Sequence, residues 1–144
     1  MRPAEILIGD DGLVVRRLDA SDATRLHVAI VESTDHLRPW MPWIPTEPHT
    51  VAEREQLICG AFASGWDEET DFGYGIFSGE ILVGGCGLHR RIDAGGLEIG
   101  YWVHVDHTGR GIATAAVRAL CEAAFCLDAV THVEIHHDKA NTAS

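Results

Sequence analysis

Apolar and polar residues alternate along several short stretches of the chain, a pattern typical of half-buried β-strands. The most regular alternation is LEIGYWVHV, residues 97–105. Successive side chains of a strand point to opposite sides, so this stretch has two distinct faces. The apolar face carries Leu97, Ile99, Tyr101, Val103 and Val105. The other face carries Glu98, Trp102 and His104.

Other apolar runs predict further strands at 5–9, 13–18, 72–77, 80–88 and 131–137. The residues DDG separate the first two runs, as expected for a hairpin-like turn. Ser78-Gly79 is predicted as a two-residue hairpin turn between the runs at 72–77 and 80–88. In the last run, Val133 and Ile135 are expected to face the core.

Helical periodicity predicts three helices. The first covers Ala23–Val31 and is capped by Asp19 or Ser21. The second opens with T-x-x-E at Thr50, runs to about Ser64 and stops at Gly65. The third extends from about Gly111 to Leu127, with small and apolar residues at spacings of four: Ile112, Ala116, Leu120 and Ala124. Between the first two, HLRPWMPWIPTEP is predicted as a loop, because proline removes hydrogen-bond donors. This order predicts an α/β domain with a mixed sheet.

Composition and charge limit the kind of protein that this sequence can encode. The 144 residues, 46% of them hydrophobic, suit one globular domain with a real core. No apolar run approaches the ~20 residues of a membrane span, and residues 1–12 do not resemble a signal peptide, so a cytoplasmic location is expected. A net charge of -11 disfavours nucleic acid and anionic membranes as partners and favours a cationic ligand such as an amine.

The cysteines and histidines are the candidate metal ligands of the sequence. Four cysteines occur without a C-x-x-C pair, so each is expected to be a small buried apolar residue: Cys59, Cys86, Cys121 and Cys126. His104 and His107 form H-x-x-H, and His132, His136 and His137 lie on or beside the next strand. A strand and its following loop are not expected to bring the first two rings together, so no metal is predicted. A reserve catalytic base at His104 or His136 is the likelier use.

The stretch HVDHTGRGIATAAV, residues 104–117, places glycines where a predicted strand meets a predicted helix. The first N–H groups of a helix lack partners, and the aligned peptide dipoles give that end a partial positive charge. Gly109 and Gly111 have no Cβ to block a ligand, so a phosphate or pyrophosphate would fit. The lysine of a P-loop and the full dinucleotide-binding glycine pattern are both missing. The alternative is that the glycines only permit a tight turn.

These residues resemble the GCN5-related N-acetyltransferase (GNAT) superfamily, whose hallmark is R/Q-x-x-G-x-G/A at such a junction. Those six positions are Thr108, Gly109, Arg110, Gly111, Ile112 and Ala113, followed by Thr114. Thr108 departs from the family's Arg or Gln. LEIGYWV, HLRPWMPW and the N-x-x-S of Asn141–Ser144 resemble the ribosomal-protein alanine N-acetyltransferase (RimJ/RimL-like) branch. The resemblance covers nearly the whole chain, in order.

The resemblance implies a GNAT-like, mostly antiparallel mixed sheet flanked by helices, in a single N-acetyltransferase domain covering residues 1–144. It implies acetyl-CoA as the acyl donor and no metal. It also implies that the chain stops before the last helix and the two final strands of the family. The terminal strand would then expose an edge through which a homodimer could form.

The family also implies roles for individual residues. Glu98 would be the base and Ser144 the acid for the departing thiolate. Backbone groups at Val103, His104 and Val105 would face the acetyl carbonyl and the pantetheine arm.

Asn141 would contact the pantetheine arm, Arg110 and Arg118 could assist the phosphates, and Trp40 and Trp43 would wall the acceptor pocket. Structural alternatives stay open for three of these assignments: a solvated or ion-paired Glu98, a helix-capping Ser144, and tryptophans that only pack the loop onto the core.

The predicted function is acetyl transfer from acetyl-CoA to a primary amine, by direct attack on the thioester. A protein N-terminal α-amine is favoured, because it titrates ~2.6 units below a lysine amine and loses its proton more readily. The alternatives are acetylation of a small-molecule amine and a non-catalytic acetyl-CoA-binding module.

Overall fold

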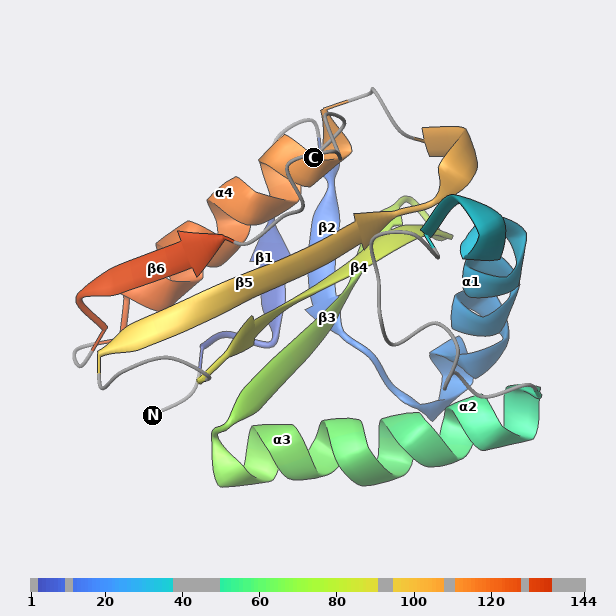
Figure 1. The fold of residues 1–144 in the computed structure, drawn as a ribbon, viewed down its shortest axis with the longest axis horizontal. Coiled ribbons are helices and arrows are strands. Elements are labelled where there is room, and N and C mark those ends of the chain that lie inside the picture. Colours follow the sequence, from blue (N-terminus) through green and yellow to red (C-terminus); the bar gives the residue numbers. More distant parts are fainter. Residues whose placement is uncertain are drawn as a thin grey trace.

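The computed structural model describes residues 3–9, 12–37, 50–90, 95–107, 111–127 and 130–135, with the side chains of 34–37 excepted. Its centre is a six-stranded sheet in the order β1-β2-β3-β4-β5-β6. The strands are β1 (Ile6–Ile8), β2 (Val14–Arg17), β3 (Asp71–Ser78), β4 (Ile81–His89), β5 (Gly96–Val103) and β6 (His132–Ile135). All neighbours are antiparallel except β5 and β6, which are parallel. The prediction of a mixed, mostly antiparallel sheet is confirmed (Figure 1).

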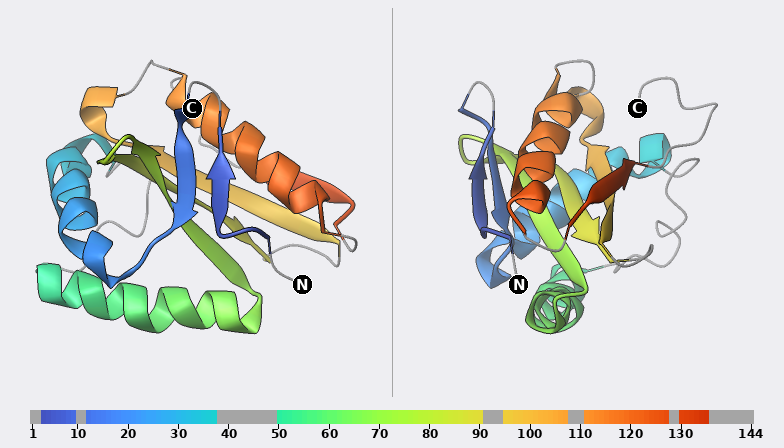
Figure 2. Two further views of the ribbon diagram at one scale, coloured as in Figure 1. Left: turned by 180° about the vertical axis from the view of Figure 1, so that it is seen from behind. Right: turned by 90° about the vertical axis from the view of Figure 1, so that its left-hand side faces the viewer.

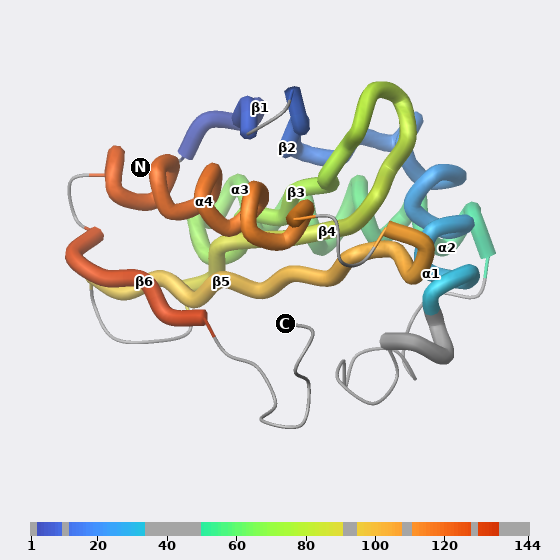
Figure 3. The backbone as a smooth tube through the Cα atoms, turned by 90° about the horizontal axis from the view of Figure 1, so that it is seen from above, coloured from blue at the N-terminus to red at the C-terminus, as the bar shows by residue number. Residues whose placement is uncertain are grey.

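The sheet curls around α4 (Ile112–Phe125), which lies between β1–β2 and β5–β6 (Figures 2 and 3). Small side chains allow this close approach: Ala115, Ala116, Ala119, Ala123 and Ala124 are all buried. Ala115, Ala116 and Ala124 belong to the main core, together with Leu120, Val15, Ile76, Leu97 and Ile99. Parallel β5–β6 pairing requires a crossover between the two strands, and α4 supplies it.

A second core lies on the other face of the sheet. There α1 (Ala23–Leu37) and the helical segment α2 (Val51–Leu57), η4 (Ile58–Phe62) and α3 (Ala63–Glu68) cover β3 and β4. Its buried members are Leu18, Ala23, Leu26, Ala29, Ile30, Ile58, Phe77 and Leu82, with Trp102 of β5 packed against them. Among the described helices, none is long and apolar enough to span a membrane.

Two of the three predicted helices run longer than the sequence predicts. α1 continues to Leu37, past the predicted end at Val31. The predicted capping residue Thr50 does accept a hydrogen bond from the Glu53 amide at 3.1 Å, but the helix passes through Gly65 to Glu68. A Cβ on Gly65 would lie 2.6 Å from the carbonyl oxygen of Asp71. Gly65 is therefore needed for close approach to β3 and does not end the helix, which stops where Glu69 turns left-handed at φ 59.

Two details of the strands also correct the prediction. Ser78 pairs with Ile81, so the hairpin turn is Gly79-Glu80 and not Ser78-Gly79. Gly79 has a φ of +63, which glycine adopts without strain. On β6, Val133 packs against the main core as predicted, but the Ile135 side chain is exposed.

The β3–β4 ladder contains a bulge. Ile76 pairs with Gly84 and Phe77 with Leu82, so Val83 of β4 has no opposite residue on β3. The register of β3 on β4 therefore differs by one residue on the two sides of Val83.

The cysteines are less buried than predicted. Cys59 and Cys126 are exposed, and Cys86 and Cys121 are half-buried. Cys59 lies within a helix that covers the sheet, and Cys126 caps the end of α4, so neither reaches the core. Burial raises the pKa of both the Cys86 and the Cys121 thiol, so both stay protonated at neutral pH.

Candidate functional site

The N-terminus of α4 is an open helix end. Its N-cap is Gly111, in a left-handed conformation with φ 74, and no side chain of the described residues forms a capping hydrogen bond there. The first α-helical bond runs from the Ala115 amide to the Gly111 carbonyl at 3.0 Å, so the amides of Ile112, Ala113 and Thr114 precede the hydrogen-bonded ladder. A Cβ on Gly111 would meet no atom within 4 Å. These amides and the helix dipole can hold an anion such as a pyrophosphate.

Among the described residues, the strand that leads to this helix end is paired on its β6 side over only part of its length. β6 pairs with β5 from Gly96 to Ile99. On the β4 side, the His104 amide donates to the Val83 carbonyl at 2.8 Å, so residues 98, 100, 102 and 104 point their backbone groups toward β4. The backbone groups of Tyr101 and Val103 therefore point to the β6 side, beyond the last β5–β6 pair. A ligand with its own amides could pair with this edge as an added strand.

Two of the three predicted backbone positions are already used within the chain. The His104 amide bonds to Val83, and the Val105 amide donates to the Ser33 hydroxyl oxygen at 3.0 Å. Of these three amides, only that of Val103 points to the open edge, because the backbone groups of successive β5 residues alternate between the β4 side and the β6 side. Val105 begins the short turn η5 (Val105–His107), whose bonding to α1 fixes the path from β5 toward α4.

His104, suggested as a reserve base, has a hydrogen-bond partner at each ring nitrogen. Its ring is buried, Nε2 lies 2.8 Å from Glu32 Oε1, and Nδ1 accepts the Asp106 amide at 3.0 Å. This pattern assigns the ring proton to Nε2, which donates to Glu32. His104 thereby ties the end of β5 to α1.

The two rings of H-x-x-H do meet, contrary to the prediction. The centroids of His104 and His107 are 5.3 Å apart in an edge-to-face arrangement, because η5 folds the chain back. Both nitrogens of His104 have other partners, as described above. Among the described residues, no three histidine, cysteine or acidic side chains are grouped to hold a metal.

Glu98 belongs to a row of polar residues that crosses four strands. The registers pair Asp71 with His89, His89 with Glu98, and Glu98 with Glu134, so the four side chains share one face. Asp71 Oδ1 lies 2.7 Å from His89 Nδ1. Glu98 is half-buried at the centre of this row.

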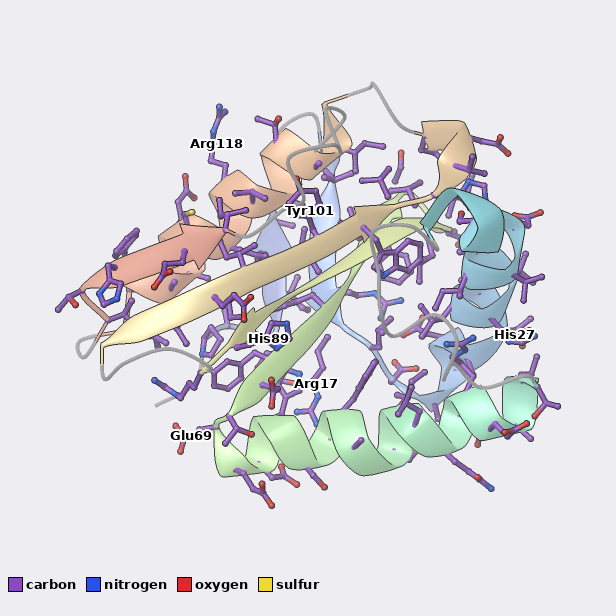
Figure 4. The ribbon with its side chains drawn as sticks, in the orientation of Figure 1. Arg17, His27, Glu69, His89, Tyr101 and Arg118 are labelled. Carbon is purple, nitrogen blue, oxygen red and sulfur yellow. The ribbon has the colours of Figure 1, made fainter. Side chains whose placement is uncertain are left out.

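Next to this row lies a row of glycines, which sequence reasoning missed together with His89. Gly73 pairs with Gly87, and Gly87 with Gly100, so three adjacent strands carry no side chain there. The His89 ring leans over the gap: its Nε2 would lie 3.1 Å from a Cβ on Gly87 and 3.6 Å from one on Gly100. Figure 4 shows His89 beside the middle of β5. Glycines at alternate positions 73, 75, 85 and 87 were the available signal.

The remaining predicted positions are outside the described residues or away from the site. Outside are Trp40, Trp43, Thr108, Gly109, Arg110, His136, Asn141 and Ser144. Arg118 is on the exposed surface of α4 and points away from β5 (Figure 4).

Comparison with known proteins gives consistent matches. The family model described as "Acetyltransferase (GNAT) domain" matches residues 12–144. The chain is 30% identical over 121 residues to "Putative ribosomal N-acetyltransferase YdaF" of Bacillus subtilis (strain 168). That match covers 81% of this chain and 63% of the relative, so the chain spans less than two thirds of that protein.

Solved structures share the fold. A "putative ribosomal-protein-serine acetyltransferase" from Vibrio cholerae is 25% identical with a TM-score of 0.80, covering 100% of this chain and 80% of that one. A RimL ribosomal L7/L12 α-N-protein acetyltransferase in complex with coenzyme A is 20% identical with a TM-score of 0.86, covering 96% and 78%. The family model spans nearly the whole sequence, and the overall fold is shared with these solved structures. The chain belongs to the GNAT acetyltransferase domain family.

Proposed function

We propose that this chain transfers the acetyl group of acetyl-CoA to a primary amine, and that the amine is the N-terminal α-amine of a ribosomal protein. The observation that carries the proposal is the junction of two features: the uncapped, positive-φ start of α4 and the unpaired edge of β5 that leads to it. Together they offer amides to a pyrophosphate and to an amide-containing arm.

Coenzyme A fits the chemistry of the described residues. The amides of Ile112, Ala113 and Thr114 would hold the pyrophosphate, with Thr108, Gly109 and Arg110 completing the loop as the family implies. The edge at Tyr101 and Val103 would pair with the pantetheine arm, and Asn141 would contact it. The coenzyme A complex of the RimL structure supports this assignment.

The acceptor assignment is supported by charge and by the names of relatives. The net charge of -11 and the row of Asp71, Glu98 and Glu134 favour a cation. The B. subtilis relative and the V. cholerae structure are both named for acetylation of ribosomal proteins. Trp40 and Trp43 would wall the pocket, Glu98 would bind or deprotonate the amine, and Ser144 would protonate the thiolate. With a ribosomal protein as acceptor, the chain would work in the cytoplasm.

The test combines binding with turnover, on the full 144-residue chain. Calorimetry measures coenzyme A binding, and a thiol-release assay compares acceptor peptides. The panel contains peptides beginning with Ala, Ser or Met, an N-terminally blocked peptide with one lysine, and a polyamine. We expect micromolar coenzyme A affinity and turnover with free N-termini. Absence of coenzyme A binding would overturn the proposal, binding without turnover would support a non-catalytic module, and turnover with only the polyamine would support a small-amine enzyme.

A further inference from the structure

We propose that His89, oriented by Asp71, is the catalytic group that accepts the proton of the attacking amine. This inference rests on the proposed acetyl transfer and adds to it a residue of β4 that no comparison assigns. It places the reacting amine on the row formed by Gly73, Gly87 and Gly100.

The contact with Asp71 fixes the orientation of the His89 ring. An ionised Asp71 accepts a hydrogen bond and has no proton to give, so Nδ1 of His89 carries the proton across the 2.7 Å contact. The lone pair of the neutral ring is then on Nε2. This is the arrangement by which a carboxylate prepares an imidazole to accept a proton.

Nε2 faces the part of β5 where the reaction would take place. An arm laid along the open edge from α4 passes Val103 and Tyr101 and then meets β6, whose pairing with β5 ends at Ile99 with Ile135. The reactive end of the donor must therefore stop beside Gly100. His89 Nε2 lies 3.6 Å from the position of a Gly100 Cβ, on the face with Glu98 and Trp102.

The glycine row makes this approach sterically open. Gly73 and Gly100 are half-buried and carry no side chains, and a Cβ on Gly73 would only touch Phe62 at 4.0 Å. The His89 side chain keeps 20% of its surface exposed. A primary amine can therefore reach Nε2 and the adjoining strand backbone from the same side.

The described residues in register with His89 across the strands are acidic. Asp71 on β3 contacts the ring, Glu98 on β5 is its cross-strand neighbour, and Glu134 on β6 is one strand further. Arg90 is directed elsewhere: its Nε donates to the Glu69 carbonyl, and its guanidinium lies 5.9 Å over the Phe72 ring. From the covering helices, the apolar Phe62 comes within 4.0 Å of the position of a Gly73 Cβ.

The acidic neighbours and the imidazole have different roles in the reaction. Carboxylates attract the ammonium form of a substrate, but attack requires the neutral amine. Imidazoles as a class titrate near ~6.5 and carboxyls near ~4.3, so an imidazole is better matched to an α-amine at ~7.7–8.0. Glu98 then holds the incoming cation, and His89 removes the proton.

The atoms balance without any further reactant. The amine nitrogen forms a bond to the thioester carbon, and its proton passes to His89 Nε2. The carbon–sulfur bond breaks, and its electron pair leaves on the sulfur of coenzyme A. This thiolate takes up one proton from the acid of the proposed function, which solvent replenishes, and the imidazolium returns its proton to solvent, so the products are the acetylated amine and free thiol.

The experiment uses His89→Asn, whose side-chain amide can still donate to Asp71 but has no basic nitrogen near Gly100. We expect kcat to fall at least ~100-fold with coenzyme A affinity unchanged, and the acidic limb of the pH profile of kcat/KM to disappear. The matched control is His132→Gln, on β6 opposite Gly96, which should keep the activity and the limb. His89→Ala should regain part of its activity in added imidazole, a rescue that a purely structural role would not give.

The orienting role of Asp71 has its own readout. Asp71→Asn should lower kcat more than it raises KM and alter the pH profile, with coenzyme A binding intact. The inference is overturned if both His89 variants keep more than a third of wild-type kcat, or if the limb survives in them and is lost in Glu98→Gln. An unsubstituted chain that binds no coenzyme A would overturn the proposed function as well, which separates the two failures.

Discussion

The hydroxyl oxygen of Ser33 accepts a hydrogen bond from the Val105 amide across 3.0 Å, which joins α1 to the turn between β5 and α4. The preceding residues of the two segments also bond to each other: Glu32 bonds to the ring of His104. The path that brings the chain to the open end of α4 is therefore set by a helix far away in sequence. Neither contact involves the residues of the glycine motif itself.

Replacing Ser33 by alanine should weaken this anchor. The Ser33 side chain is fully buried, so its loss leaves the Val105 amide without its acceptor. We expect the free energy of unfolding to fall by about 1–2 kcal/mol, measured by urea denaturation. Ser64→Ala, at an exposed position of α3, is the control and should change stability by less than ~0.5 kcal/mol. Equal stability of the two variants would contradict the anchoring role.

Gly111→Ala tests the open end of α4. Its φ of +74 should cost about 1–2 kcal/mol of stability in any L-residue, and the new Cβ would stand in the space that a phosphate must enter. Gly12→Ala is matched to it, with φ +76 and also no atom within 4 Å. Both variants should lose similar stability, but only Gly111→Ala should weaken coenzyme A binding, by about tenfold in calorimetry. Identical dissociation constants would argue that the phosphate sits elsewhere.

Alanine substitutions at Gly65 and Gly60 distinguish two effects of glycine: it allows close approach of another backbone, and it lowers helix propensity. Both lie in the long helical segment, but a Cβ would lie 2.6 Å from the Asp71 carbonyl oxygen at Gly65 and meet nothing within 4 Å at Gly60. Gly65→Ala should destabilise the protein by about 2–3 kcal/mol, because backbone must move. Gly60→Ala should stabilise it by about 0.5–1 kcal/mol. Thermal unfolding of the pair measures the difference, and the same sign for both would refute this account.

The buried carboxylate of Asp22 should make stability depend on pH. It accepts hydrogen bonds from both terminal nitrogens of Arg16, at 2.8 and 2.7 Å, and from the Asp19 amide at 2.9 Å. Burial alone would raise the pKa of Asp22, but these hydrogen bonds and the charges of Arg16 and Arg25 outweigh it and lower the pKa below 3.8. The resulting stabilisation is complete above the unfolded-state pKa and is lost as the pH falls through the lowered folded-state value.

Asp22→Asn should therefore cost about 2–3 kcal/mol at pH 7, since Arg16 loses its buried partner. Chemical denaturation at a series of pH values should show this deficit shrinking below about pH 4. The charge-matched control, Glu55→Gln at an exposed position of α2, should leave stability within ~0.5 kcal/mol. A deficit that is constant down to pH 2 would rule out the titration of Asp22 as its cause.

Local sequence patterns predicted much of the fold, because the spacing of apolar residues follows from the geometry of the helix or strand that contains them. The alternation at 97–105 gave β5 and placed Leu97, Ile99 and Tyr101 toward the main core, although the strand ends at Val103. The apolar spacing after Gly111 gave α4 to within two residues. Gly65 was misread because the sequence shows a helix breaker but not the strand that presses against it. His104 was placed on the polar face, and its burial depends on the partner Glu32, which is 72 residues away.

The candidate site also has one part that was predictable from the sequence and one part that was not. The helix end was predictable, since the glycines and the helix they precede are contiguous. The Asp71–His89 pair was not, because two residues 18 apart meet only through the register of two strands. The row that extends from them to Glu98 and Glu134 depends on four strands at once.

That register depends on one residue. The turn at Gly79-Glu80 sets Phe77 opposite Leu82, and an unbroken ladder from there would put Asp71 opposite Leu88. The extra residue at Val83 advances β4 by one position, so His89 comes opposite Asp71 and the glycines of the two strands align. If Val83 instead paired with Ile76, every later pair would slip by one residue, which would turn the imidazole to the opposite side of the sheet and bring a leucine alongside the carboxylate, so an unremarkable aliphatic residue determines which chemistry this face of the protein can display.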